Sequence, residues 1–402
     1  MSVPLNLLFA LIFGVLFSCS KSPEVPPQNQ DLAWYKGNLH THSYWSDGDE
    51  FPEVIMAWYK KNGYNFVSLS DHNILAKGEA WVDISPDSIY QEGFKRYLQA
   101  YGSEWVNYKE DSSGISVQLK TLEEYQPLFQ TSGDFIILQA EEITDSFQGK
   151  PLHLNATNLS TLIKPQGGSS VIQVLQRNIN AVIRQRDSLD TPIMVHINHP
   201  NFGFAITLED MIALRGEQFF EVFNGHPQVY NLGDSTHMDT ESMWDQINIA
   251  YLQNSQPLLY GLATDDSHNY HNSGSTWSNS GRGWIQVRAD TLSPEALISS
   301  MEKGDFYSST GVTLKELSYQ QNTLQVKVAQ EDQVHYEIQF IGCSKEDMQT
   351  EILKTVTGSE ASFTVDPNHL FVRVKIISNK KIPHPIETFS TEMAWTQPVV
   401  PQ

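Results

Sequence analysis

GNLHTHSYWSDGDEFPEVIMAWYKKNGYNFVSLSDHN (residues 37–73) contains two strand-like segments with a helical stretch between them. The first segment carries His40 and His42, whose side chains point to the same side of an extended strand. Residues 51–62 have the apolar spacing of a helix, and the second strand-like segment leads to His72. The stretch therefore predicts a strand–helix–strand unit with metal-type ligands at the ends of both strands.

Strand-like and helical segments alternate from residue 32 to about residue 312. The strand candidates are 37–42, 65–71, 135–143, 152–157, 192–199, 219–224, 258–265 and 283–287, and the helical candidates are 51–62, 86–101, 121–130, 169–187, 207–214, 240–253 and 294–302. This alternation predicts a parallel α/β sheet, and about seven repeats predict a barrel. The segment 83–131 is long for one crossover, and we interpret it as a lid-like insertion beside the site.

The pattern changes from about Thr313 to the end of the chain. Short alternating segments such as LQVKVAQ, VHYEIQFIG, ASFTV and LFVRVKII follow one another without a convincing helix. Residues 313–402 are therefore predicted to form a small antiparallel, sandwich-like β domain. Its expected role is structural or as a spacer, since no aromatic cluster favours carbohydrate binding.

The 402-residue chain is acidic, with a formal net charge of −21. Such a surface repels polyphosphate chains, which counts against a nucleic-acid polymer as the main substrate. A small phosphorylated molecule stays compatible with this charge, because bound divalent ions reverse the local sign.

The first 19 residues resemble the signal peptide of a bacterial lipoprotein. Residues 7–17 are apolar, long enough for a signal h-region and short for a bilayer span. Leu16-Phe17-Ser18-Cys19 resembles a cleavage box in which Cys19 becomes the lipidated N-terminus, although no Lys or Arg precedes it. The alternative is an uncleaved N-terminal anchor, and both interpretations export the protein to the cell envelope.

The polar, Pro-rich residues 20–31 have the composition of a flexible tether. With Cys19 lipidated, Cys343 is left without a cysteine partner, and no intramolecular disulfide is expected.

Histidine and acidic residues lie at the ends of nearly all the predicted strands. The C-terminal ends of the strands of an α/β barrel meet at one face, so residues far apart in the sequence would converge there. Six imidazoles and three carboxylates fit two or three divalent ions better than one. The set is His40, His42, Asp47, His72, Glu142, His153, His199, Asp266 and His268.

Six segments occur in an order that resembles one enzyme family. HTHSYWSDG, SLSDHN, ILQAEEIT, PLHLNATN, HINHP and ATDDSH together resemble the PHP (polymerase and histidinol phosphatase) family of metal-dependent phosphoesterases. The resemblance covers residues 32–312 and implies a distorted (β/α)7, TIM-like barrel with a multinuclear metal centre at the C-terminal face of the strands.

The resemblance also implies which residues hold each ion. The first ion would be held by His40, His42, Asp266 and a bridging Glu142, the second by Glu142, His153 and His199, and the third by Asp47, His72 and His268. Asp47 stands where some family members have histidine. The ions expected are zinc, manganese or iron.

For two of these ligands, a nearby residue of the same type offers an alternative. Glu141 and Glu142 are adjacent, so only one of them can point inward. The resemblance implies that Glu142 is the ligand, and Glu141 is expected to face solvent or to support a ligand from behind. His196 lies at an odd offset from His199, so it is expected on the opposite face of the strand.

Three further residues receive expectations of their own. Asp266 rather than Asp265 is expected to be a metal ligand, because Asp266 has the DxH spacing. Asp71 is expected to orient a ligand. Arg282 is a candidate phosphate-binding residue, with a surface ion pair as the alternative. The remaining histidines are expected to be surface or structural residues, with His271 as the first exception to consider: His226, His237, His271, His335, His369 and His384.

Three functional hypotheses follow. The leading one is an exported phosphoesterase that hydrolyses a small phosphomonoester or phosphodiester with a metal-activated hydroxide. The second is hydrolysis of a non-phosphate bond on the same barrel, as in amidohydrolases, and the third is a non-catalytic surface lipoprotein that binds a ligand. All nine ligand positions hold competent residues, which disfavours the third. The carbamylated lysine common in amidohydrolases has no evident counterpart at a strand end, which disfavours the second.

Overall fold

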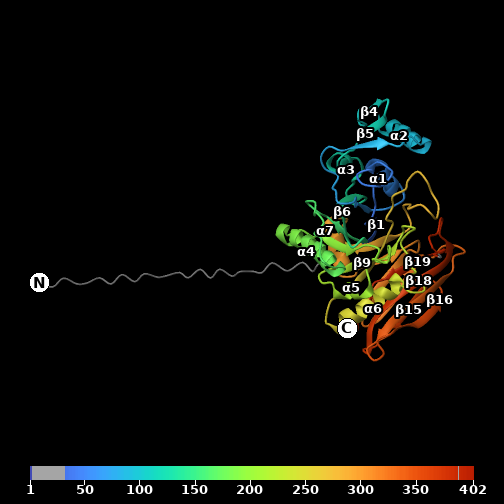
Figure 1. The fold of residues 1–402 in the computed structure, drawn as a ribbon. Coiled ribbons are helices and arrows are strands. Elements are labelled where there is room, and N and C mark those ends of the chain that lie inside the picture. The colour runs from blue at the N-terminus through green and yellow to red at the C-terminus, as the bar shows by residue number, and fades with distance from the viewer. Residues whose placement is uncertain (2–31, 388) are drawn as a thin grey trace. The chain divides into compact units, whose positions relative to one another are not determined.

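The computed structural model describes Met1, residues 32–387 and residues 389–402 (Figure 1). Leu32–Gln402 form one compact unit. The predicted signal segment after Met1, with Cys19, and the predicted tether lie outside the described residues. Among the described helices, none combines the length and the apolar character needed to cross a membrane.

Strands and helices alternate along the first three quarters of the unit. The strands are β1 (Ala33–Asn38), β2 (Phe66–Leu69), β3 (Trp81–Ile84), β4 (Tyr108–Asp111), β5 (Gly114–Gln118), β6 (Ile136–Phe147), β7 (Lys150–Thr157), β8 (Met194–Ile197), β9 (Phe219–Asn224), β10 (Tyr260–Thr264), β11 (Trp284–Ala289) and β12 (Phe306–Ser309). The helices are α1 (Pro52–Lys61), α2 (Ser88–Tyr101), α3 (Leu122–Phe129), α4 (Val171–Leu189), α5 (Leu208–Ala213), α6 (Thr240–Gln253) and α7 (Pro294–Glu302). All seven predicted helices are confirmed, with ends within two residues of those predicted.

Short polar side chains fix where most of these helices begin. The residue before the first helical turn accepts a hydrogen bond from a backbone N–H of that turn in α3, α4, α5, α6 and α7. This bond satisfies a donor that the helix itself leaves free. In α1 a proline occupies the first turn instead, where its missing N–H costs nothing.

Seven strands are consecutive neighbours in the large sheet, in the order β10-β9-β8-β7-β6-β2-β1. The pairs β1–β2, β2–β6, β8–β9 and β9–β10 are parallel, whereas β7 is antiparallel to both β6 and β8. The expectation of a parallel sheet is therefore wrong at β7. The cause is the tight turn at Gln148 and Gly149, both with positive φ, which folds β6 and β7 into a hairpin.

The large mixed α/β sheet is confirmed, and the closed barrel is not. Beyond β1 the sheet continues into the antiparallel strands β11 and β12, and the described residues form no closed sheet. The chain just after β1 meets the chain just after β10 at an isolated parallel bridge between Thr41 and Ser267. There the Asp266 N–H donates to the His40 carbonyl over 3.0 Å, and the His42 N–H donates to the Ser267 carbonyl over 2.9 Å.

The C-terminal region consists of strands, as predicted: β13 (Leu314–Gln320), β14 (Thr323–Val328), β15 (Tyr336–Ser344), β16 (Thr350–Thr357), β17 (Glu360–Thr364), β18 (His369–Lys381) and β19 (Thr391–Thr396). β13, β14 and β17 form a separate antiparallel sheet, while β19, β18, β15 and β16 extend the large sheet from β12. Apolar side chains of the two sheets, including Val326, Ile338 and Val374, share one core. The predicted boundary at residue 312 falls between β12 and β13. Strand β19 lies after this boundary in the sequence but pairs with β12, which lies before it.

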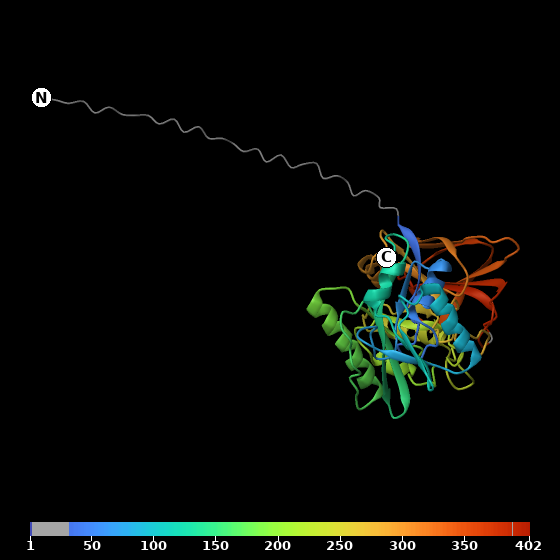
Figure 2. The same cartoon turned by 90° about the horizontal axis from the view of Figure 1, so that it is seen from above.

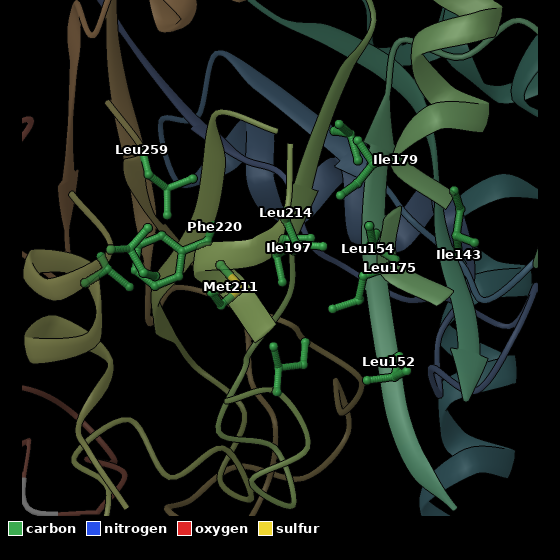
Figure 3. Close-up of a cluster of buried hydrophobic side chains, with 14 of the residues drawn as sticks. Ile143, Leu152, Leu154, Leu175, Ile179, Ile197, Met211, Leu214, Phe220 and Leu259 are labelled. Carbon is green, nitrogen blue, oxygen red and sulfur yellow. The ribbon is translucent and has the colours of Figure 1, made fainter. Parts of the chain in front are cut away.

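The largest core cluster joins α4 and the C-terminal region to the strands that lead to the candidate ligands. Leu175 and Ile179 of α4 pack in the same cluster as Leu154 of β7 (Figure 3). Trp395 of β19 belongs to this cluster too, with its ring centroid 6.1 Å from that of Phe223 in β9. The C-terminal region thus packs against the core that also supports the strands β7 to β10.

The inserted segment forms its own small layer. β3, β5 and β4 make a three-stranded antiparallel sheet beside α2, and the view from above shows this layer in cyan in front of the large sheet (Figure 2). Phe94 and Tyr97 of α2 pack with Trp45 and Phe51, and the Phe51 and Tyr97 rings stack 3.9 Å apart. The insertion therefore supports the loop that carries Asp47.

Candidate metal centre

The nine predicted ligands converge at the ends of β1, β2, β8 and β10 and on β6, β7 and the loop before α1. His40 and His42 flank the bridge residue Thr41, and their Nε2 atoms each lie 3.3 Å from Glu142 Oε2 and 3.2 Å from Asp266 Oδ1. This juxtaposition matches the i, i+2 geometry expected of the opening HxH pair. Both imidazoles are completely buried.

Glu142 of β6 lies at the centre of the cluster, and its two carboxylate oxygens face different partners. Oε2 faces His40 and His42 and lies 2.9 Å from His72 Nδ1, while Oε1 lies 2.9 Å from His153 Nδ1 and 3.4 Å from His199 Nε2. The Asn198 amide also donates to Oε1 over 2.8 Å. One carboxylate thus lies between two separate sets of imidazole nitrogens.

A third set lies at the solvent side of the cluster. Asp47 Oδ1 is 3.4 Å from His268 Nε2, and Asp47 Oδ2 is 3.4 Å from His72 Nε2. The Asp47 side chain is 57% exposed, whereas Glu142 is buried. His42 Nδ1 lies 3.6 Å from Asp47 Oδ1, so this ring stands between the exposed set and the buried ones.

The electrostatics of the cluster favour bound cations. Burial alone would raise the pKa values of Glu142 and Asp266, but the surrounding histidines hold both well below their usual range. For His72, burial acts to lower the pKa, yet Glu142 and Asp47 raise it to about 11. The cluster is therefore a buried region of strong negative potential, in which positive charge is stabilised.

The donor atoms fit divalent metal ions. His40 Nδ1 lies 2.7 Å from Glu221 Oε1. In the neutral form that binds a metal ion, the ring would therefore carry its proton on Nδ1 and present the Nε2 lone pair to Glu142 and Asp266. Lone pairs facing carboxylate oxygens repel each other unless a cation lies between them. Among the described residues, several buried donor atoms of the cluster have no hydrogen-bond partner: His40 Nε2, both ring nitrogens of His42, Glu142 Oε2 and His153 Nδ1. Imidazole and carboxylate ligands suit zinc, manganese and iron.

Two of the neighbouring alternatives lie elsewhere than expected. Glu141 is completely buried rather than solvent-facing, and its Oε1 accepts a hydrogen bond from the Ile163 backbone N–H over 2.6 Å. Burial raises its pKa to about 8. The argument that His196 and His199 lie on opposite faces of one strand does not apply, because β8 ends at Ile197 before His199. His196 is also buried, with Nε2 3.4 Å from Glu221 Oε1.

Asp265 and Asp71 hold loops that carry ligands. The Asp265 carboxylate accepts backbone hydrogen bonds from residues 281–283 and one from the Tyr59 hydroxyl, and it makes no ion pair with the cluster histidines. Asp71 accepts hydrogen bonds from the Ser43 N–H, the Ser43 hydroxyl and the Ser46 hydroxyl. Asp71 therefore fixes the turn that presents Asp47. It was expected to orient a ligand, and it does so through this turn rather than by direct contact.

The structure does not bring Arg282 to the cluster. Its guanidinium donates to the carbonyl oxygens of Gly225 over 2.8 Å and Gly274 over 2.7 Å, and the side chain is buried rather than paired at the surface. Phosphate binding by Arg282 at the metal centre stays a prediction.

A cavity of about 340 Å³ opens onto the cluster, which is large enough for a small substrate. Seven of the candidate ligands line it, together with three other residues, Phe202, His226 and Gln228. No residue of the insertion 83–131 is among its lining residues, so the predicted lid does not cover it directly.

His226 is the functional candidate that the sequence analysis assigned to the surface or the scaffold. Its Nδ1 accepts a hydrogen bond from the Gln228 N–H over 3.2 Å, which places the proton of the neutral ring on Nε2. Burial lowers its pKa to about 4, so the ring is neutral at pH 7. The Nε2–H group remains as a donor for a molecule in the cavity.

The other histidines are structural or exposed. His271 Nε2 lies 2.8 Å from the Asp49 carbonyl oxygen and joins the loop after His268 to the loop after Asp47. His335 is exposed, and His237 pairs with Asp234 at the surface. His369 and His384 lie in the C-terminal region.

Glu221 of β9 was also missed by the sequence analysis. The carboxylate is completely buried, and it also accepts hydrogen bonds from the His199 N–H and the Thr264 hydroxyl, both over 2.8 Å. It thereby orients His40 and the backbone of His199. Its position among the apolar residues of FFEVF, the first five residues of β9, is the signal that could have found it, because an acidic residue is rarely buried without a partner.

Replacing Glu221 with glutamine is expected to weaken binding of the ion at His40 by about 10- to 100-fold, the usual cost of losing a carboxylate behind a metal-bound histidine. Competition with a chromogenic chelator measures this affinity. Glu217→Gln is the matched control, because Glu217 is also buried but bonds to Tyr251. Equal affinities in the two variants would contradict the orienting role.

Comparison with known proteins gave matches at the level of structure only. No family model matches the chain, and no curated protein sequence matches it. A two-domain protein from Bacteroides vulgatus containing a predicted PHP-like metal-dependent phosphoesterase is 12% identical, with 92% of this chain and 96% of that chain covered at a TM-score of 0.40.

Two further structures match smaller parts of the chain. A protein from Bifidobacterium adolescentis proposed to be a metal-dependent phosphoesterase is 13% identical over 59% of this chain and 87% of that one, at a TM-score of 0.27. An amidohydrolase from Chromobacterium violaceum with bound sulfate and no metal is 12% identical over 60% of this chain and 90% of that one, at a TM-score of 0.26. The structural neighbours thus include a predicted PHP-like metal-dependent phosphoesterase and a second protein proposed to be a metal-dependent phosphoesterase.

Proposed function

We propose that the chain is a PHP-type metal-dependent phosphoesterase that hydrolyses a small phosphomonoester or phosphodiester. The observation that carries this proposal is the position of Glu142, whose two oxygens face two sets of imidazoles within 3.4 Å. A carboxylate placed in this way suits a pair of ions that share it.

The residues named above would have the following roles. His40, His42, Glu142 and Asp266 would hold one ion, Glu142, His153 and His199 a second, and Asp47, His72 and His268 a third. When bound, the ions would lower the pKa of a water molecule and neutralise charge on the phosphoryl oxygens. His226 would donate its Nε2–H to a substrate oxygen, and Phe202 would limit the width of the cavity that it lines.

The proposed scaffold is the distorted (β/α)7 arrangement of that family. It would consist of β1, β2 and β6 to β10, with the Thr41–Ser267 bridge joining the first strand to the last at the end that carries the ligands. The absence of lysine among the described residues that line the cavity favours this proposal over an amidohydrolase with a carbamylated lysine.

Turnover of p-nitrophenyl phosphate and bis-p-nitrophenyl phosphate by the metal-loaded full chain tests the proposal. Turnover of the first ester identifies a phosphomonoesterase, and turnover of the second identifies a phosphodiesterase. A metal-loaded protein that hydrolyses neither ester, and no sugar or nucleoside phosphate either, would contradict the proposal and direct attention to non-phosphate bonds.

Replacing His226 with alanine is expected to reduce kcat/KM about 10- to 100-fold, because a hydrogen bond to a charged group contributes roughly 1.5–3 kcal/mol. Metal content should stay unchanged, and His226→Gln should recover part of the activity because its amide can donate. His237→Ala is the control, since that exposed ring lies away from the cavity. Full activity in His226→Ala would exclude a role in the reaction.

We further propose that the protein is exported and anchored to the cell envelope through lipid on Cys19. The support is the apolar segment before the Leu-Phe-Ser-Cys box and the polar stretch that follows it. Cys19→Ser is expected to abolish incorporation of labelled palmitate in a bacterial host, whereas Cys343→Ser should leave it unchanged. Persistent labelling of Cys19→Ser would refute the anchor.

A further inference from the structure

A second cavity, of about 270 Å³, lies away from the candidate metal centre and shares no lining residue with the cavity there. It is bounded by α1, the beginning of β11, and residues 279–282 and 383–384. Trp58, Tyr64 and Trp284 supply aromatic walls, and Lys36 and Arg282 supply positive charge. None of the described residues that line it is aspartate or glutamate, although the chain has a net charge of −21.

The Lys36 ammonium lies between two aromatic rings. Its Nζ is 3.9 Å from the Tyr64 ring centroid and 4.0 Å from the Trp284 ring centroid. The ion pairs formed among the described residues do not include it. Burial lowers its pKa to about 8, an effect that Asp265 opposes only in part. The ring contacts hold the charge in place without supplying an acceptor for its three N–H groups.

Two further donors in the same cavity are buried without a partner among the described residues. They are the Tyr64 hydroxyl and the Arg282 Nε–H, in side chains that are 2% and 5% exposed. The other two nitrogens of Arg282 are fixed by the carbonyl oxygens of Gly225 and Gly274. Leaving a buried donor without an acceptor is costly. A cavity wall that holds two such donors beside an unpaired ammonium therefore favours an acceptor with negative charge.

We propose that this cavity binds a small organic oxyanion, a phosphate or carboxylate group on a compact body. The oxyanion would accept hydrogen bonds from Lys36, Tyr64 and Arg282, and the body would pack against Trp58 or Trp284. The proposal does not depend on the function assigned to the metal centre, because the two cavities are separate.

Binding of inorganic phosphate and of acetate to the EDTA-treated full chain, followed by tryptophan fluorescence and calorimetry, tests the proposal. Removing metal prevents either probe from binding to ions at the other centre. Saturable binding of one anion per chain is expected. Lys36→Met should raise the Kd by at least about tenfold, equivalent to 1.4 kcal/mol, because the methionine keeps the stem between the rings and removes the charge. Lys315→Met, at an exposed lysine of β13, should bind like the wild type.

Tyr64→Phe provides a second variant if Lys36→Met does not fold. It removes only the unpaired hydroxyl, so the fold should be unaffected while the Kd rises. Binding of phosphate alone would identify a phosphate ligand, and binding of acetate alone a carboxylate ligand. No binding of either probe at roughly 10 mM, ten times a Kd of 1 mM, would overturn the proposal. Equal binding by wild type, Lys36→Met and Tyr64→Phe would overturn it as well.

Discussion

Glu142→Gln should lose bound metal and lower phosphoester hydrolysis by at least about 1,000-fold, equivalent to roughly 4 kcal/mol of transition-state stabilisation. The carboxylate faces His40 and His42 through one oxygen and His153 and His199 through the other. Glutamine keeps one acceptor and replaces the other with an N–H₂ group, which repels a cation. A single substitution therefore removes a ligand from two sets at once.

The adjacent Glu141 provides a matched control for this experiment. Glu141→Gln makes the same chemical change one residue away, on the face of β6 that contacts Ile163. With its pKa raised to about 8, Glu141 is largely protonated at pH 7, and glutamine imitates that state. Metal content and hydrolysis, measured on both variants at pH 7, should fall only in Glu142→Gln. Equal losses in both would mean that the register of the EEIT segment is assigned wrongly.

Arg373→Met should lower the free energy of unfolding by roughly 3–5 kcal/mol, the usual cost of removing one partner of a buried ion pair. Arg373 of β18 is 1% exposed, and its Nε and Nη2 donate to the two oxygens of Asp245 over 2.7 and 2.8 Å. Its Nη1 also lies 2.9 Å from Glu241. Both acidic residues belong to α6. The substitution leaves the buried Asp245 without a cation, whereas Glu241 keeps Lys375, whose Nζ lies 2.6 Å from its Oε2.

Urea unfolding of the metal-free full chain measures this effect without a contribution from bound ions. Lys327→Met is the comparison, because Lys327 and Glu360 form an ion pair in which both side chains are at least a third exposed, and such a pair contributes little to stability. Similar losses in the two variants would show that the α6–β18 junction does not stabilise the chain beyond an ordinary surface pair.

The convergence of the nine candidate ligands could be predicted because their spacing is local and their positions follow one rule; their role as metal ligands stays a prediction. His40 and His42 lie two residues apart, as do Asp266 and His268, and most of the others follow or end a predicted strand. The helices were predictable for the same reason, since their apolar spacing and capping residues are local. These features need no knowledge of which segments are neighbours in space.

The missed features depend on contacts between distant segments. The antiparallel direction of β7 was signalled only by the Gln148–Gly149 turn. His226 lies in a loop whose direction the sequence does not specify. The return of β19 to pair with β12 could not be read from the strand pattern of residues 313–402, because that pattern indicates strands without indicating their partners. Glu221 also carried a readable signal, as a charged residue among the apolar residues of β9.

Metal content of the purified full chain, measured by elemental analysis after reconstitution with zinc, manganese or iron, tests the central claim most directly. Three separate sets of donors around one buried carboxylate predict two or three ions per chain, and fewer in Glu142→Gln. Less than one ion per chain with each of the three metals would contradict the account, because the buried imidazole and carboxylate atoms would then need another explanation.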